Sequence, residues 1–218
     1  MKTLSSRIWR RARLSAIGLF GDRRGIAATE FAIIVPMMLI MFFGVIEFSS
    51  GVAVDRKVTF VARTETDLVS QAPADGSNQN TATINDTYLL NAFNASGAIL
   101  QPYLATPANA TISEIYVDTS QVAKIQWSKA ATFSSSGAAT LANSSHLAGD
   151  VVTSLVPSSL RVAQTYVILS EVSYLYTPTV GYVMTSSVSL SDVAYTRPRQ
   201  SICVFYPATP APPTCPTL

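Results

Sequence analysis

The chain has 218 residues, of which 48% are apolar and only 13% are charged, which suits one modest domain plus a membrane segment. Seven of its 15 basic side chains and one of its 13 acidic ones lie in residues 1–24, so the remaining residues hold 8 basic and 12 acidic groups, a net charge of −4. Because the basic arm adjoins a hydrophobic run, we interpret it as a topology signal and expect no nucleic-acid binding.

The hydrophobic run is long enough to cross a bilayer. Residues 31–46 carry no charged or strongly polar side chain, and residues 26–46 would extend about 30 Å as a helix, the thickness of the hydrocarbon core. A secretory signal peptide is the main alternative, but residues 47–49 offer no small-x-small cleavage site. We therefore expect a basic cytoplasmic leader at 1–25, a transmembrane segment at 26–47, the rest of the chain outside the cytoplasm, and Glu47 at the membrane interface.

The helical pattern continues beyond the membrane. No proline occurs between residues 47 and 69, and apolar residues recur at helical spacing, which predicts an amphipathic extension over residues 48–70. The expected apolar face comprises Val54, Val58, Val61, Ala62, Leu68 and Val69, and the polar side chains comprise Asp55, Arg56, Lys57, Arg63, Glu65 and Asp67. Pro36 predicts a kink in the span, although membrane helices also tolerate proline, and both interpretations stay open.

The start of the span carries a family resemblance. It consists of Gly25, four further residues, then Glu30 and Phe31 at the start of an apolar run. This pattern is similar to a type IV prepilin processing site. The longer stretch "GIAATEFAIIVPMMLIMFFGVIEFSSG" resembles the TadE-like pilus-assembly proteins of the bacterial tight-adherence (Flp) system, and the resemblance extends over residues 23–70.

This resemblance implies a minor pseudopilin, or pilin-like component of the bacterial inner membrane, with its head in the periplasm. It implies cleavage between Gly25 and Ile26 by a prepilin peptidase. The expected partners are that peptidase, other pilins or pseudopilins, and the proteins of the pilus-assembly platform.

The residue types agree with such processing. A small residue such as Gly25 lets a peptidase approach the backbone closely. Cleavage would make Glu30 the fifth residue of the mature chain, where a carboxylate favours the helix dipole and can pair with the new ammonium group on Ile26 in a medium of low dielectric constant. A hydrated Glu30 at headgroup level is the alternative. The competing function is an uncleaved, single-pass adhesion or scaffold protein that binds a partner through its head.

Residues 71–206 predict an extracytoplasmic α+β head. We expect a loop at 70–83, a helix at 83–98 and two strands within 110–130 around a turn at 118–121. The helix should bury one face, made of Ile84, Tyr88, Ala92, Ala95 and Ile99.

The second half of the head completes the predicted sheet. Asp150 should cap a short helix through Leu155, followed by a further turn in "VPSSLRVA". Residues 165–176 are apolar on both faces and predict a central strand, and residues 185–199 supply a fourth strand. The expected fold is a long N-terminal helix followed by a small domain with an antiparallel sheet of three or four strands.

The C-terminal residues 207–218 are rich in proline and should be extended. Cys203 and Cys215, the only cysteines, should form a disulfide in an oxidising compartment, with two unpaired thiols as the alternative. His146 is the only histidine, so two cysteines and one distant histidine make an incomplete metal site. No nucleophile elbow, phosphate loop or zinc-protease motif occurs, and we expect neither catalysis nor a cofactor.

Overall fold

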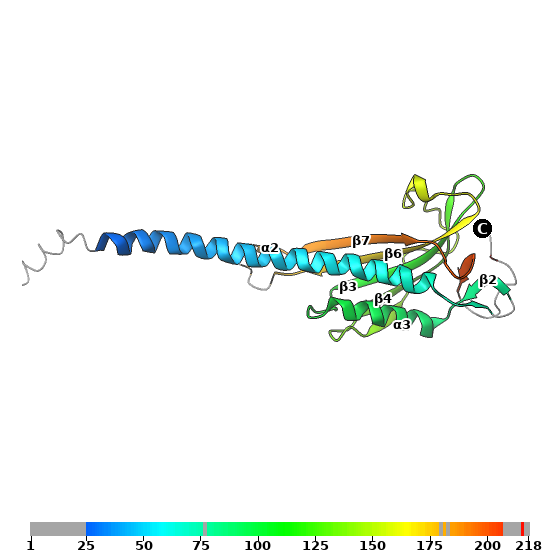
Figure 1. Cartoon of the computed structure of the whole chain (residues 1–218), viewed down its shortest axis with the longest axis horizontal. Coiled ribbons are helices and arrows are strands. Elements are labelled where there is room, and N and C mark those ends of the chain that lie inside the picture. Colours follow the sequence, from blue (N-terminus) through cyan, green and yellow to red (C-terminus); the bar gives the residue numbers. More distant parts are fainter. Residues whose placement is uncertain (1–24, 76–77, 179–180, 182–183, 207–214, 216–218) are drawn as a thin grey trace, which may run out of the picture.

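The computed structural model describes residues 25–75, 78–178, 181, 184–206 and 215. The leader at 1–24 and most of the proline-rich tail lie outside the described residues. A long helix, α2, projects from a head built of two sheets and a second helix (Figure 1). The α+β class predicted from the sequence is therefore confirmed.

Helix α2 (Ile26–Ser70) contains 45 residues, which corresponds to about 68 Å at 1.5 Å per residue. Its buried residues begin at Glu47, and the predicted apolar positions from 54 to 69 are buried except for half-buried Leu68. Glu65 was expected on the polar side but is fully buried. The helix ends where the backbone N–H of Gln71 donates to the carbonyl groups of Asp67 and Leu68.

The main sheet has five antiparallel strands in the order β5-β4-β3-β6-β7. Their bounds are β3 (Ala108–Val117), β4 (Ala123–Phe133), β5 (Ala139–Ala142), β6 (Thr165–Tyr176) and β7 (Val188–Thr196). The predicted turn between β3 and β4 is present, and the Asp118 carboxylate accepts hydrogen bonds from the N–H groups of Ser120 and Val122. Strand β6 is central, as predicted, because β3 and β7 flank it.

The helices cover one face of this sheet. Helix α2 packs on β6 and β7, and α3 (Asp86–Gly97) lies beside α2 and reaches β5, followed by the 3₁₀ turn η2 (Ala98–Leu100). The Asn85 side chain caps α3 by accepting from the N–H of Tyr88, as its residue type favours. The buried face differs from the prediction: Leu89 and Phe93 are buried, whereas Ala95 is exposed.

A second sheet was not expected. Strands β1 (Ala74–Asp75), β2 (Asn78–Thr83) and β8 (Cys203–Phe205) form it in the order β1-β2-β8, with β2 parallel to β8. The prediction of a loop at 70–83 was therefore wrong. The polar sequence of β2 has no apolar alternation, and its pairing partner β8 lies about 120 residues later in the chain.

A small lobe between β5 and β6 contains the other error. The predicted helix from Asp150 to Leu155 is absent, because Val151 forms a β-bridge with Lys124 and the Val152 N–H donates to the Ala123 carbonyl. The backbone is thus paired with the edge of β4. The further turn is present as the 3₁₀ helix η3 (Ser158–Leu160).

Candidate functional site

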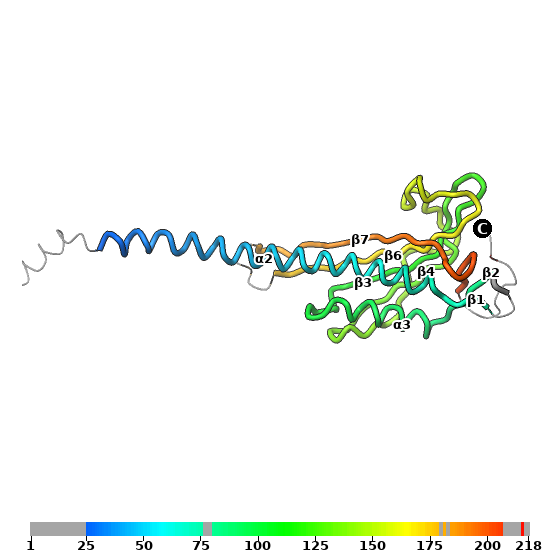
Figure 2. The backbone as a smooth tube through the Cα atoms, in the orientation of Figure 1, coloured from blue at the N-terminus to red at the C-terminus, as the bar shows by residue number. Residues whose placement is uncertain are grey.

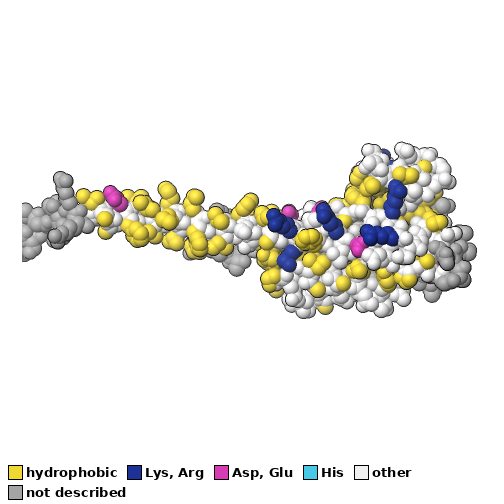
Figure 3. Space-filling view, in the orientation of Figure 1, with side chains coloured by type: hydrophobic (Ala, Val, Ile, Leu, Met, Phe, Trp, Pro, Cys, Tyr) yellow, Lys and Arg dark blue, Asp and Glu magenta, His cyan; other side chains and the backbone are white. Residues whose placement is uncertain are grey.

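The first half of α2 presents its apolar side chains outward. Among them Phe31 is 68% exposed and Ile33 is 73% exposed, and hydrophobic atoms cover this half of the helix (Figure 3). In its most apolar 18-residue window only 6% is buried, whereas the core helix of a soluble protein would be mostly buried. Within the described residues α2 is the one helix long and apolar enough to cross a membrane, which is compatible with a single-pass anchor.

Gly25 lies at the N-cap position of α2, and Ile26 is the first helical residue. A Cβ atom added at Gly25 would meet no heavy atom of the described residues within 4 Å, and the φ of Gly25, −79°, is open to any residue. The fold itself therefore does not require glycine at this position.

Glu30 is exposed one turn into α2. No hydrogen bond or ion pair joins it to another described residue. Since it stands four residues after Ile26, the two lie on the same face of the helix. The described part of the helix start also has no side-chain cap, so its first N–H groups leave a partial positive charge near this carboxylate.

Pro36 lies inside α2, and the helix continues on both sides of it. The missing N–H of proline removes one helical hydrogen bond at this level of the span. The kink at Pro36 stays a prediction.

Glu47 is only 2% exposed, because the head covers it. Its position at the membrane interface stays a prediction. The backbone N–H of Met184, in the loop between β6 and β7, donates to its carboxylate over 2.8 Å. The Tyr176 hydroxyl lies 3.5 Å from its backbone carbonyl oxygen. The β6–β7 hairpin runs back along α2 (Figure 2), and Glu47 ties its end to the helix.

Two further carboxyl groups are buried in the head. Glu65 accepts hydrogen bonds from the hydroxyls of Ser96, at 2.8 Å, and Ser170, at 2.6 Å, and burial raises its pKa to about 7. Glu114 accepts from the N–H of Val204, at 2.6 Å, and burial raises its pKa to about 8. Sequence reasoning missed both sites because these hydrogen-bond donors come from distant parts of the chain.

Cys203 and Cys215 lie within bonding distance, with sulfur atoms 2.07 Å apart and Cα atoms 5.8 Å apart. Cys203 is fully buried beside Tyr116 and Tyr166, on strand β8. The pair joins β8 to a point in the C-terminal segment twelve residues later.

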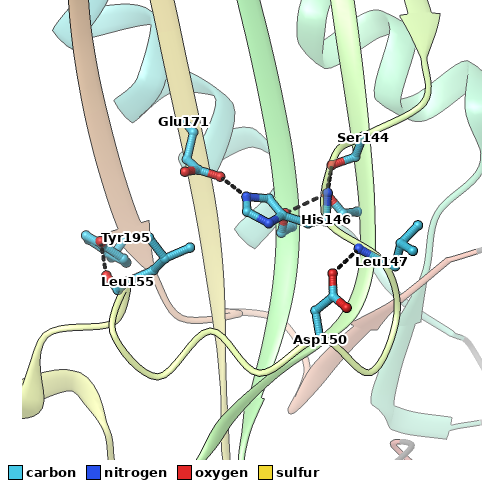
Figure 4. A network of polar contacts seen from close by, with 9 residues as sticks. Ser144, His146, Leu147, Asp150, Leu155, Glu171 and Tyr195 are labelled. Carbon is cyan, nitrogen blue, oxygen red and sulfur yellow. Dashed lines mark hydrogen bonds and ion pairs between the residues drawn. The ribbon is translucent and has the colours of Figure 1, made fainter.

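His146 lies on the face of the main sheet opposite α2, in the loop that leads into the small lobe (Figure 4). Its Nε2 atom is 2.7 Å from a carboxylate oxygen of Glu171, and its backbone N–H donates to the Ser144 hydroxyl over 3.0 Å. Within the described residues no hydroxyl is bonded to the other ring nitrogen, and no three metal-ligating side chains gather. These contacts hold the loop on the sheet.

The same loop has one internal hydrogen bond and one further bond to the sheet. The Leu147 N–H donates to the Asp150 carboxylate over 2.7 Å, and the Tyr195 hydroxyl donates to the Leu155 carbonyl over 2.5 Å (Figure 4). These contacts add to the backbone pairing with β4 that takes the place of the predicted helix.

Comparison with known proteins finds similarity to one protein family, in the N-terminal part of the chain. Residues 25–64 match the model of the family described as "TadE-like protein". The chain has no significant match among curated proteins or among solved structures. The stretch from Gly25 to Thr64, which includes Glu30 and Pro36, is therefore TadE-like, as the motif at its start predicted.

Proposed function

We propose that this protein is a minor pseudopilin, or pilin-like inner-membrane component, that helps to assemble a tight-adherence (Flp-type) pilus. The observation that carries the proposal is the TadE-like first half of α2, whose apolar side chains begin directly after Gly25 and are largely exposed in the described structure. Such a helix needs either lipid or other helices around it.

In this proposal a prepilin peptidase removes the basic leader between Gly25 and Ile26. The open surroundings of Gly25 support this step, because the small residue then serves an external enzyme rather than the fold. The N-terminus starts in the cytoplasm, the head faces the periplasm, and the chain itself performs no catalysis.

Cleavage would change the electrostatics of the helix start. It would release an ammonium group on Ile26, one helical turn from the exposed carboxylate of Glu30. Each charge is costly in hydrocarbon, so pairing them, within one chain or with a neighbouring pilin, would favour packing of the helices with other pilins and with the assembly platform. An uncleaved span would instead act as a tether for a head with an adhesive or scaffolding role.

The first test measures processing and assembly together. In cells with an active prepilin peptidase, the intact mass of the membrane-purified protein should correspond to a chain that begins at Ile26. Gly25→Leu should block trimming while leaving the head folded, because the site has free space, and Gly25→Ala should interfere less.

Variants at Glu30 test the role of the carboxylate. Breaking a buried charge pair costs about 3–5 kcal/mol, so Glu30→Gln should reduce the number of assembled pili at least about tenfold, with membrane insertion unchanged. Glu30→Asp keeps the charge and should retain more assembly. A native chain that still begins at Met1, together with normal piliation of Glu30→Gln, would favour the tether.

A further inference from the structure

An apolar cleft lies between α2 and the β6–β7 hairpin, at the end of the hydrophobic span. It has a volume of about 200 Å³, and its apolar lining comes from Phe48, Val52, Tyr176, Met184, Val188 and Leu190. Gly51 leaves room on the helix side, because a Cβ atom there would already lie 3.5 Å from the ring of Tyr176.

The cleft opens at the level where the hydrocarbon layer should end. Phe48 stands 22 residues after Ile26, which places it about 33 Å along the helix. The hydrocarbon core of a bilayer is about 30 Å thick. With Ile26 at the inner boundary, the cleft therefore opens at the outer one.

A second groove connects the cleft to the span. It lies on the same side of α2 and is lined by Ile40, Met41, Gly44, Val45, Phe48 and Val52, so the two hollows share Phe48 and Val52. An apolar path thus runs along α2 from the expected membrane interior into the head, and whatever surrounds the span has access to the cleft.

We propose that the cleft holds part of one acyl chain of a membrane phospholipid. A cavity of about 150 Å³ is enough for a benzene ring, so 200 Å³ suits a short length of a single hydrocarbon chain. It does not suit a whole helix, whose diameter with side chains is about 10–12 Å. The inference rests on the membrane insertion in the proposed function.

The charge at the cleft indicates the class of headgroup. Asp55 is the one charged side chain among the lining residues. It is exposed, and no hydrogen bond or ion pair joins it to another described residue. Its carboxylate would attract an ammonium group and repel an unbalanced anionic headgroup, which favours an ethanolamine phospholipid over a glycerol one.

The test uses the full-length protein in vesicles that contain a phosphatidylethanolamine with a photoactivatable diazirine in its acyl chain. After illumination and digestion, mass spectrometry should find lipid adducts on the span and also on the head peptide that contains Val188 and Leu190. Replacing the labelled lipid by phosphatidylglycerol with the same acyl chain should lower the head signal several-fold, and Asp55→Asn should abolish that preference. Equal head labelling by the two lipids in the native protein would refute the choice of headgroup.

Two filling variants and one control make the result specific. Gly51→Leu, from the helix, and Leu190→Trp, from the sheet, should each reduce head adducts at least tenfold while the span stays labelled. Leu175→Trp, at a residue of β6 that is 51% exposed and does not line the cleft, should leave the head adducts unchanged.

The outcomes separate this inference from the proposed function. A labelled span without head adducts in the native protein would overturn the lipid site and leave the anchor standing. A photoreactive amino acid in place of Leu190 tests for a protein partner without the labelled lipid. If it crosslinks to a peptide of another subunit, the cleft binds a protein instead of an acyl chain. Absence of adducts on both span and head would contradict membrane insertion itself.

Discussion

At the scale of single residues, the described part of the head contains two buried carboxyl groups whose hydrogen-bond partners include no basic side chain. Glu65 and Glu114 are both fully buried, and the partners given by their hydrogen bonds are serine hydroxyls, an indole N–H and a backbone N–H. Such groups lower the cost of a buried carboxylate without cancelling its charge. Burial therefore remains the largest influence on the pKa of each group, and it raises both pKa values.

This arrangement predicts a dependence of stability on pH. The folded pKa of Glu65, about 7, exceeds the ordinary value of 4.5, so the folded state binds more protons between these pH values. Its contribution to stability is therefore present below about pH 4.5 and is lost as the pH rises toward 7, and Glu114 extends the loss toward pH 8.

Glu65→Gln should reduce the loss of folding stability that occurs as the pH rises. Between pH 5 and 8 the reduction should be on the order of 3 kcal/mol in the free energy of unfolding. The amide keeps one acceptor and one donor for Ser96 and Ser170, so the fold should survive. Denaturant unfolding of the detergent-solubilised protein at both pH values measures the effect. If the variant and the native protein lose the same stability over this range, Glu65 does not titrate as described.

At the scale of elements, the two halves of α2 have different environments. Up to Ile46 none of its residues is buried, and from Val54 onward one face is buried against β6, β7 and α3. The β6–β7 hairpin bridges the change, since its loop is bonded to Glu47. One continuous helix thus serves both as the candidate membrane anchor and as the central support of the head.

Strand β8 is short and lies at one edge of the small sheet. It has three residues and pairs only with β2 in the described chain, and its buried Cys203 is joined to Cys215. A loop of twelve residues closed in this way stabilises a fold by about 3 kcal/mol through the reduced entropy of the unfolded chain.

Cys215→Ala should lower the free energy of unfolding by about that amount, and reductant should have a similar effect on the native protein and none on the variant. Limited proteolysis should then cut more readily on the C-terminal side of β8. Cys215→Ala leaves the fully buried Cys203 in place and removes only the partly buried partner. Equal stability of the native and variant proteins in oxidising buffer would exclude a stabilising role for the disulfide.

At the scale of the whole molecule, the head packs along the side of α2 and not only at the end of this helix. The hairpin turns back to Glu47 while the β3–β4 turn lies at the opposite end of the sheet, next to the start of β6 (Figure 1). From Glu47 to Ser70 the helix rises about 35 Å. The head therefore begins at the expected membrane surface and extends away from it.

Spin labels at the two ends of the head test this placement. Ser186→Cys, in the β6–β7 loop, and Ser120→Cys, in the β3–β4 turn, replace exposed serines. In reconstituted vesicles the label at position 186 should be relaxed strongly by a nickel chelate attached to lipid headgroups, whereas the label at position 120 should be relaxed weakly. Similar relaxation at both positions would mean that the head lies flat on the bilayer.

The sequence alone determined the parts of this protein that depend on local pattern. The apolar run, the proline-free amphipathic stretch and the Gly25-to-Glu30 spacing predicted the long helix and its TadE-like start, because periodicity and residue type act within a few turns. The turn at Asp118 and the central strand β6 were predictable for the same reason.

Only the tertiary structure decided what depends on contact between distant segments. Strand β2 exists because β8 pairs with it, the segment after Asp150 pairs with β4 instead of forming a helix, and Glu65 is buried because Ser96 and Ser170 reach it. None of these partners is marked in the local sequence. A polar residue or segment is buried where the fold supplies its hydrogen bonds, and that supply is a property of the assembled chain.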